Sequence, residues 1–202
     1  AEERPAPAGL IWPDFDRPVA FLPIEGGEVV SEDGHSRANP AEASWVVRIL
    51  GMLLEPGDLD TTDIGVITPY NGQVRVILDL LEQAGGTTLG DRWHGVEVRS
   101  VDGYQGREKE VIILSTVRSN PEGEIGFLDD ARRLNVAITR AKRGLIVIGD
   151  QNTLRRSDGV GKILCTRLLG TLLMDGGLRR LKVEFTLRRL PSELLDVLRC
   201  KT

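Results

Sequence analysis

The sequence predicts an α/β fold in which a mainly parallel sheet is covered by helices on both faces. Short runs rich in Val, Ile and Leu alternate with longer segments in which apolar residues recur at helical spacing. The short runs are continuously apolar, as expected for strands that are buried on both faces. A sheet of this kind gathers ligands at the carboxyl ends of its strands.

The first strand and the first helix have clear boundaries. An apolar run at 18–24 is the first expected strand. In the helix at 40–55, Asn39 can cap free amide groups, and Glu42 can reach back to complete a capping box. Proline suits the first helical position, and a Pro-Gly pair ends the segment. The apolar face of this helix consists of Val46, Ile49, Leu50, Leu53 and Leu54.

The middle of the chain alternates in the same way. A strand is expected at 63–70, and further strands at 95–101 and 109–117. The connection at 102–110 is short for a parallel crossover, so a hairpin stays open at this point. A helix is expected at 71–86, with an apolar face made of Val74, Ile77, Leu78 and Leu81.

The last part of the chain contains a helix with two distinct faces, expected at 129–144 and followed by a strand at 144–150. Its apolar stripe consists of Leu134, Ala137, Ile138 and Ala141. A neighbouring face carries Arg133, Val136, Arg140 and Arg143. Arginine suits phosphate because its planar group offers paired donors and stays charged. Two more helices are expected at Lys162–Met174 and Ser192–Leu198.

Composition indicates one globular domain. With 202 residues, of which 41% are hydrophobic and 28% charged, the chain is long enough for one good core. No apolar run approaches the roughly 20 residues that span a bilayer, so no membrane partner is expected. Residues 1–11 lack the apolar stretch of a signal peptide and are expected to be a flexible lead-in of a longer protein.

The cysteines and histidines do not predict a metal site, and the charged residues are distributed unevenly along the chain. Cys165, Cys200, His35 and His94 stand alone, so no metal site is expected, and two reduced thiols fit an intracellular location, cytoplasmic or nuclear. Net charge is -4, but residues 1–98 carry 6 basic and 17 acidic side chains, whereas the remainder carries 20 and 13. The basic second half gives weak support for an anionic partner, since single surface cations are usually only solvated.

A polar insert, DGYQGREKE at 102–110, directly follows a strand. Gly103 and Gly106 would let the backbone approach a ligand, although the charged residues after them also suit a solvated turn. A phosphate-binding loop is not expected. In the GVGK text at 159–162, Arg156 stands where a P-loop needs its first glycine, so this chain alone should not cradle a nucleotide.

Three segments together resemble one family. ITPYNGQ, VRSVDGYQGREKEVIILSTVRSN and IGFLDDARRLNVAITRAKRGLIVIGD resemble the motifs of up-frameshift-type superfamily-one helicases, in the same order and at similar spacing. The regulator-of-nonsense-transcripts branch is the most similar. The resemblance covers residues 12–152 and implies the second RecA-like domain, a three-layer fold. In this family ATP with Mg²⁺ binds between two such domains, so the first RecA-like domain is an implied partner.

The resemblance also implies roles for individual residues. Arg140 is similar to the arginine that reaches the γ-phosphate and stabilises charge in the transition state. Glu108 resembles the residue that binds the ribose, with Gly106 and Arg107 beside it. Arg133 and Asn135 lie in the motif that joins the two sites and are also expected to bind nucleic acid. The residues expected to hold single-stranded RNA or DNA by its sugar-phosphate backbone are Thr68, Pro69, Tyr70, Ser100, Val101 and Asp102.

The implied function is that of the C-terminal motor domain of an ATP-dependent helicase, which translocates on and unwinds nucleic acid. The fragment alone is expected to be inactive, because the Walker A motif lies on the first domain. Residues 153–202 differ from the family in length and lack its tryptophan, so they form a helical continuation of the domain or a divergent extension. Two alternatives remain: a non-catalytic RecA-like module that binds nucleic acid, and part of a helicase-nuclease.

Overall fold

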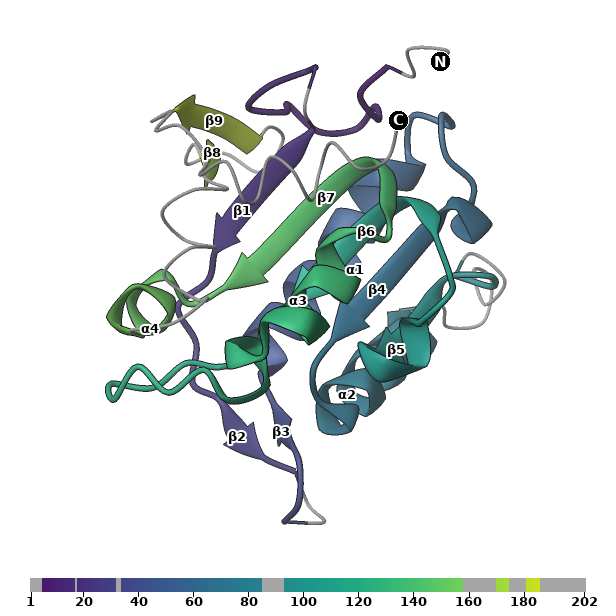
Figure 1. Cartoon of the computed structure of the whole chain (residues 1–202). Helices are drawn as coiled ribbons and strands as arrows, with labels where there is room; N and C mark the ends of the chain where they lie inside the picture. Colours follow the sequence, from purple (N-terminus) through teal and green to yellow (C-terminus); the bar gives the residue numbers. More distant parts are fainter. Residues whose placement is uncertain are drawn as a thin grey trace.

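The computed structural model describes residues 5–16, 18–31, 34–84, 93–157, 170–174 and 181–185. Within these residues, seven strands form one sheet in the order β5-β4-β6-β7-β1-β8-β9 (Figure 1). Neighbouring strands are parallel except for the antiparallel pair β8–β9, which confirms the mainly parallel sheet. The strands are β1 (Val19–Pro23), β4 (Ile64–Thr68), β5 (Glu97–Ser100), β6 (Lys109–Ser115), β7 (Ala141–Gly149), β8 (Gly170–Met174) and β9 (Leu181–Phe185).

Helices cover both faces of this sheet. Helices α1 (Pro40–Leu54) and α2 (Asn71–Ala84) pack on one face, and α3 (Ala131–Ile138) and α4 (Gln151–Arg156) on the other (Figure 1). Strand β6 serves both sides, because Ile113 joins the core under α1 while Ile112 joins the core under α3. The predicted three-layer α/β fold is therefore confirmed. No helix among the described residues is both long enough and apolar enough to cross a membrane.

A small antiparallel pair, β2 (Val29–Val30) and β3 (Arg37–Ala38), projects from the carboxyl edge of the main sheet just before α1 (Figure 1). The cap of α1 forms as predicted, with Asn39 Oδ1 accepting from the Glu42 amide at 3.2 Å. The capping box does not form, because the Asn39 amide donates to Gln73 Oε1 at 2.7 Å and, of the Asn39 groups, the buried Glu42 accepts only from the side chain, at 3.3 Å. Its Oε2 accepts from Ser115 Oγ at 2.7 Å and from the Val117 amide at 2.9 Å.

The connection between β5 and β6 is a parallel crossover, which rules out the hairpin that the sequence left open. Strand β4 lies between β5 and β6 and is parallel to both. The insert crosses the face of β4 through the short 3-10 turn η2 (Asp102–Tyr104). Residue 65 must be glycine here, because a Cβ would overlap the buried Tyr104 hydroxyl. The contact between Tyr104 and Gly65 takes the place of the helix that usually joins two parallel strands, so the crossover can be short.

The helix predicted at 129–144 is wrong in its second half. After the 3-10 turn η3 (Gly126–Asp129), α3 ends at Ile138, and β7 begins at Ala141, which pairs with Lys109. Pairing with β6 overrides the local helical pattern. Arg143 therefore lies in β7, where it binds Asp58 at 2.9 Å and does not extend a basic helix face. On α2, Leu78 is exposed and does not share the buried side with Ile77 and Leu81.

The two ends of the chain also differ from expectation. Residues 5–11 of the expected lead-in lie packed on the domain: Leu10 is buried, and the Trp12 indole donates to the Pro7 carbonyl at 2.6 Å. The helix predicted at Lys162–Met174 is wrong for Gly170–Met174, which form β8 beside β1. The rest of that helix and the one predicted at Ser192–Leu198 lie outside the described residues.

Candidate functional site

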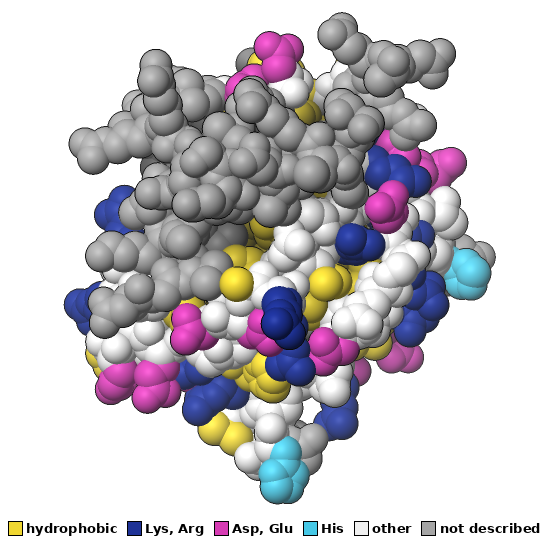
Figure 2. Space-filling model, viewed as in Figure 1, with side chains coloured by type: hydrophobic (Ala, Val, Ile, Leu, Met, Phe, Trp, Pro, Cys, Tyr) yellow, Lys and Arg dark blue, Asp and Glu magenta, His cyan; other side chains and the backbone are white. Residues whose placement is uncertain are grey.

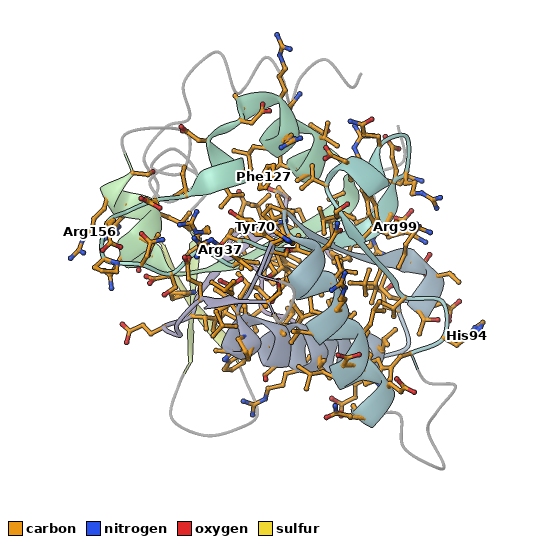
Figure 3. The ribbon with its side chains drawn as sticks, turned by 90° about the horizontal axis from the view of Figure 1, so that it is seen from below. Arg37, Tyr70, His94, Arg99, Phe127 and Arg156 are labelled. Carbon is orange, nitrogen blue, oxygen red and sulfur yellow. The ribbon has the colours of Figure 1, made fainter. Side chains whose placement is uncertain are left out.

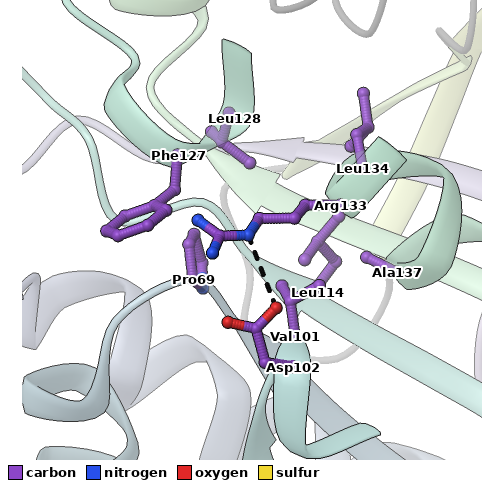
Figure 4. A pocket seen from close by; sticks show the side chains of 9 residues that line it. All are labelled: Pro69, Val101, Asp102, Leu114, Phe127, Leu128, Arg133, Leu134 and Ala137. Atoms are coloured by element: carbon purple, nitrogen blue, oxygen red, sulfur yellow. Dashed lines mark ion pairs between the residues drawn. The ribbon is translucent and has the colours of Figure 1, made fainter. Parts of the chain in front are cut away.

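The predicted strand-end residues meet at the carboxyl edge of the sheet. Thr68 pairs in register with Ser100, and the Val101 amide donates to the Thr68 carbonyl at 3.1 Å. Together with η3 and the start of α3, this edge borders a small pocket of about 20 Å³ (Figure 4). The pocket is lined by Pro69, Val101, Asp102, Leu114, Phe127, Leu128, Arg133, Leu134 and Ala137.

These strand-end residues differ in how accessible they are. Asp102 is exposed, and Pro69 and Ser100 are half-buried. Thr68 is fully buried, and its hydroxyl has no hydrogen-bond partner within the described part of the chain. Tyr70 is only 8% exposed. A ligand at this edge would therefore meet Pro69, Ser100 and Asp102 before the other predicted residues.

Arg133 connects α3 to the carboxyl edge. Its Nε lies 3.4 Å from Asp102 Oδ1, and its guanidinium group lies 4.6 Å from the centre of the Phe127 ring (Figure 4). Asp130 begins α3 by accepting hydrogen bonds from the amides of residues 132 and 133. Asn135 is exposed on the same helix and is not part of the pocket lining.

An exposed aromatic residue, Phe127, completes this edge and was missed in the sequence analysis. Its ring is 46% exposed and meets Tyr70 edge-on, with the ring centres 5.4 Å apart (Figure 3). Behind them, the nearly buried Arg118 forms a 2.7 Å ion pair with Glu28. The signal in the sequence was a bulky aromatic beside a glycine, in the polar segment that precedes the arginine helix.

The residues predicted to contact nucleotide meet at the opposite edge, where the parallel strands begin. The Lys109 amide donates to the Arg140 carbonyl at 3.0 Å, which brings Glu108 beside the end of α3. Gly106 has a φ of +76°, and no atom lies near the position of a Cβ. The backbone angle, and not crowding, is therefore the reason for glycine at this point.

The arginines at this edge have local partners. Arg140 donates from Nε to the Val136 carbonyl at 3.0 Å and from Nη2 to Thr139 Oγ1 at 3.0 Å. Arg107 forms a 2.6 Å ion pair with Glu97, which also contacts Arg99 and Lys109, while Glu108 is exposed. Partly exposed ion pairs and single hydrogen bonds are weak, so both arginines can turn to an incoming anion at low cost.

The surface around these two edges has mixed charge. Figure 2 shows Lys and Arg side chains interspersed with Asp and Glu over the lower part of the face that carries α3. Among the described residues, no three His, Cys, Asp or Glu side chains gather in a way that could hold a metal ion. Binding of a polyanion at this face would therefore depend on a few individual arginines more than on a broad basic surface.

The motifs and their arrangement can now be compared with known proteins. A family model described as "AAA domain" matches residues 1–152, about three quarters of the chain. The chain belongs to the AAA-domain family. This AAA domain is also similar to regulators of nonsense transcripts and to proteins named ATP-dependent helicases, which confirms the resemblance that the motifs indicated.

Three relatives illustrate the extent of the similarity. The chain is 38% identical over 197 residues to the regulator of nonsense transcripts 1 homolog of Drosophila melanogaster, which is 97% of the chain and 16% of that protein. It is 45% identical over 157 residues to the ATP-dependent helicase NAM7 of Saccharomyces cerevisiae, 77% of the chain and 16% of that protein. It is 46% identical over 143 residues to the regulator of nonsense transcripts 1 homolog of Neurospora crassa, which is 71% of the chain and 13% of that protein. The chain thus spans about one sixth of the length of the curated relatives it matches.

Proposed function

We propose that this chain is the second motor domain of an ATP-dependent helicase that moves along single-stranded nucleic acid. Two relatives carry the name ATP-dependent helicase. The observation that carries the proposal is the placement of α3, whose first turn carries Arg133 at the carboxyl edge and whose end is followed, two residues later, by Arg140 at the amino edge. An arginine suited to phosphate thus lies near each end of one short helix, one at each edge of the sheet.

The amino edge supplies half of a nucleotide site. Arg140 and Arg107 are cations suited to phosphate oxygens, and the exposed Glu108 carboxylate can accept hydrogen bonds from ribose hydroxyls. ATP, bound with Mg²⁺ against the first RecA-like domain, would supply the phosphoanhydride bond that is cleaved. The side chain of Arg140 would stabilise the charge that develops there.

The carboxyl edge supplies part of the strand grip, and two segments connect it to the amino edge. Pro69, Ser100 and Asp102 lie where a sugar-phosphate backbone can pass, with Arg133 beside them. The insert leads from Asp102 directly to Glu108, and α3 leads from Arg133 to Arg140. A change in nucleotide occupancy at one edge would therefore be transmitted to the strand at the other edge.

Replacement of Arg140 by alanine tests this proposal in the longer protein that contains both motor domains. Loss of the Arg140 guanidinium should reduce ATP hydrolysis by about 10³-fold or more, because it would remove the cation proposed to stabilise charge on the transferred phosphate. Binding of single strands without nucleotide should change little, since Arg140 lies at the other edge. Steady-state hydrolysis and strand affinity are measured on the same preparation.

Arg132 is the matched control, because it is an exposed arginine on α3 and is not part of the pocket lining. Arg132→Ala should leave hydrolysis within a few fold of the parent rate, consistent with the small effect of most exposed substitutions. Equal losses of hydrolysis and strand binding in a folded Arg140→Ala protein would contradict the assignment of the two edges.

A further inference from the structure

We propose that Phe127 is a stacking platform for one base of the bound single strand. This inference rests on the proposed function, since it adds a residue to the strand grip at the carboxyl edge. Stacking on an aromatic ring contributes about 1–3 kcal/mol per base and is tolerant of sequence, because every base has a π face.

The exposure of Phe127 is not explained by the packing of the domain. Its neighbour in η3, Leu128, is 3% exposed and anchors the turn in the core, whereas Phe127 is 46% exposed. Removing a phenylalanine ring from water is stabilising, and this turn forgoes part of that gain. A ring held outside the core beside the predicted strand path therefore points to a ligand.

The ring is held in place from two sides. The Arg133 guanidinium lies over it at 4.6 Å and is itself anchored by Asp102, while Tyr70 meets it at an interplanar angle of 75° (Figures 3 and 4). These contacts come from α3 and from the turn after β4, so the ring is oriented before any ligand arrives. Preorganisation reduces the entropy that binding would otherwise cost.

The surroundings favour a base over an apolar protein segment. The adjoining pocket has a volume of about 20 Å³, enough for a water molecule but not for a base, so a base would lie on the exposed ring. Charged Asp102 and Arg133 line the same pocket as the ring, which disfavours an apolar partner. A nucleotide unit combines a flat aromatic base with a phosphate that Arg133 can bind.

Strand binding by the full chain tests the inference, using an oligouridylate of about ten nucleotides and the same oligomer with its bases removed. Phe127→Ala should weaken binding of the base-containing strand by about 5- to 150-fold, the equivalent of 1–3 kcal/mol. It should leave affinity for the abasic strand unchanged. Phe127→Trp should keep or strengthen the preference for the base-containing strand, because indole also stacks.

Phe15 offers a matched control, because it is an exposed phenylalanine in the segment before β1. Phe15→Ala should leave both affinities unchanged. Equal effects of Phe127→Ala on both strands, or no effect on either, would overturn the stacking role while the proposed function stands. If the parent chain binds neither strand, the strand grip of the proposed function fails, and the stacking role fails with it.

Discussion

At the scale of single residues, the buried carboxyl of Glu42 has a measurable effect on stability. Burial raises the pKa of Glu42 to about 8, and the charge of Asp150 acts in the same direction, although hydrogen bonds from Ser115 and Val117 oppose the shift. The ordinary pKa is 4.5. Between these values the folded protein keeps a proton that the unfolded chain has released, so the free energy of unfolding falls as pH rises.

We therefore expect stability to decrease from about pH 5 to about pH 8, by up to roughly 1.4 kcal/mol per pH unit. Urea unfolding at several pH values measures the slope. The variant Glu42→Gln cannot ionise and should lose most of this dependence. An unchanged slope in the variant would show that other groups cause it.

The sequence predicted the position of Glu42 in the first turn of α1 but not the direction of its side chain. Its hydroxyl partner, Ser115, lies 73 residues further along the chain at the end of β6. Val117, which donates its amide to Glu42, adopts a left-handed φ of 71°. A β-branched residue rarely takes this conformation, and local sequence gives no sign of it. Only the assembled core brings these groups together.

At the scale of elements, the insert between β5 and β6 contains a glycine that can be tested in isolation. Gly106→Ala should lower the free energy of unfolding by about 1–2 kcal/mol, because alanine is strained at the positive φ of this position. No neighbouring atom would collide with the new methyl group, so the cost comes from the backbone alone. Thermal or urea unfolding measures it.

The nearby Gly103 separates backbone strain from crowding. A Cβ at Gly103 would lie 3.4 Å from Ser100 Oγ, an ordinary contact, and this glycine does not have a positive φ. Gly103→Ala should therefore be close to neutral. A loss of stability at Gly103 that equals the loss at Gly106 would argue against the conformational explanation.

Elements with strong local signals were predictable, and those that depend on distant pairing were not. The cap, periodicity and Pro-Gly stop of α1 predicted its extent to within a residue or two. The helix over 129–144 was too long, because nothing local shows that Ala141 pairs with Lys109. The motifs named residues at both edges of the candidate site. The position of the Phe127 ring and the Arg133–Asp102 contact depend on how η3 packs beside α3, and the motifs alone do not predict this packing.

At the scale of the whole molecule, the segment before β1 contributes to the domain. The Ala8 amide donates to Asp58 at 3.1 Å, Arg143 donates to the Pro5 carbonyl at 3.1 Å, and Leu10 is buried. Removing residues 1–11 should lower the free energy of unfolding by about 2–4 kcal/mol, from lost burial and hydrogen bonds. Removal of residues 1–4 alone, measured by the same denaturant titration, is the comparison. Equal stability of the two shortened chains would contradict this expectation.

The short length of α3 limits how far its two ends can move when the helix tilts. The helix has eight residues, so at about 1.5 Å per residue it is about 12 Å long. A tilt of about 10° around its middle would move each end by only about 1 Å, whereas bases in a stacked strand are about 3.4 Å apart. Pivoting of α3 can thus tighten or loosen a contact at either edge, but it cannot advance a strand by one nucleotide. If the domain acts as proposed, each advance would have to come from its displacement as a rigid body.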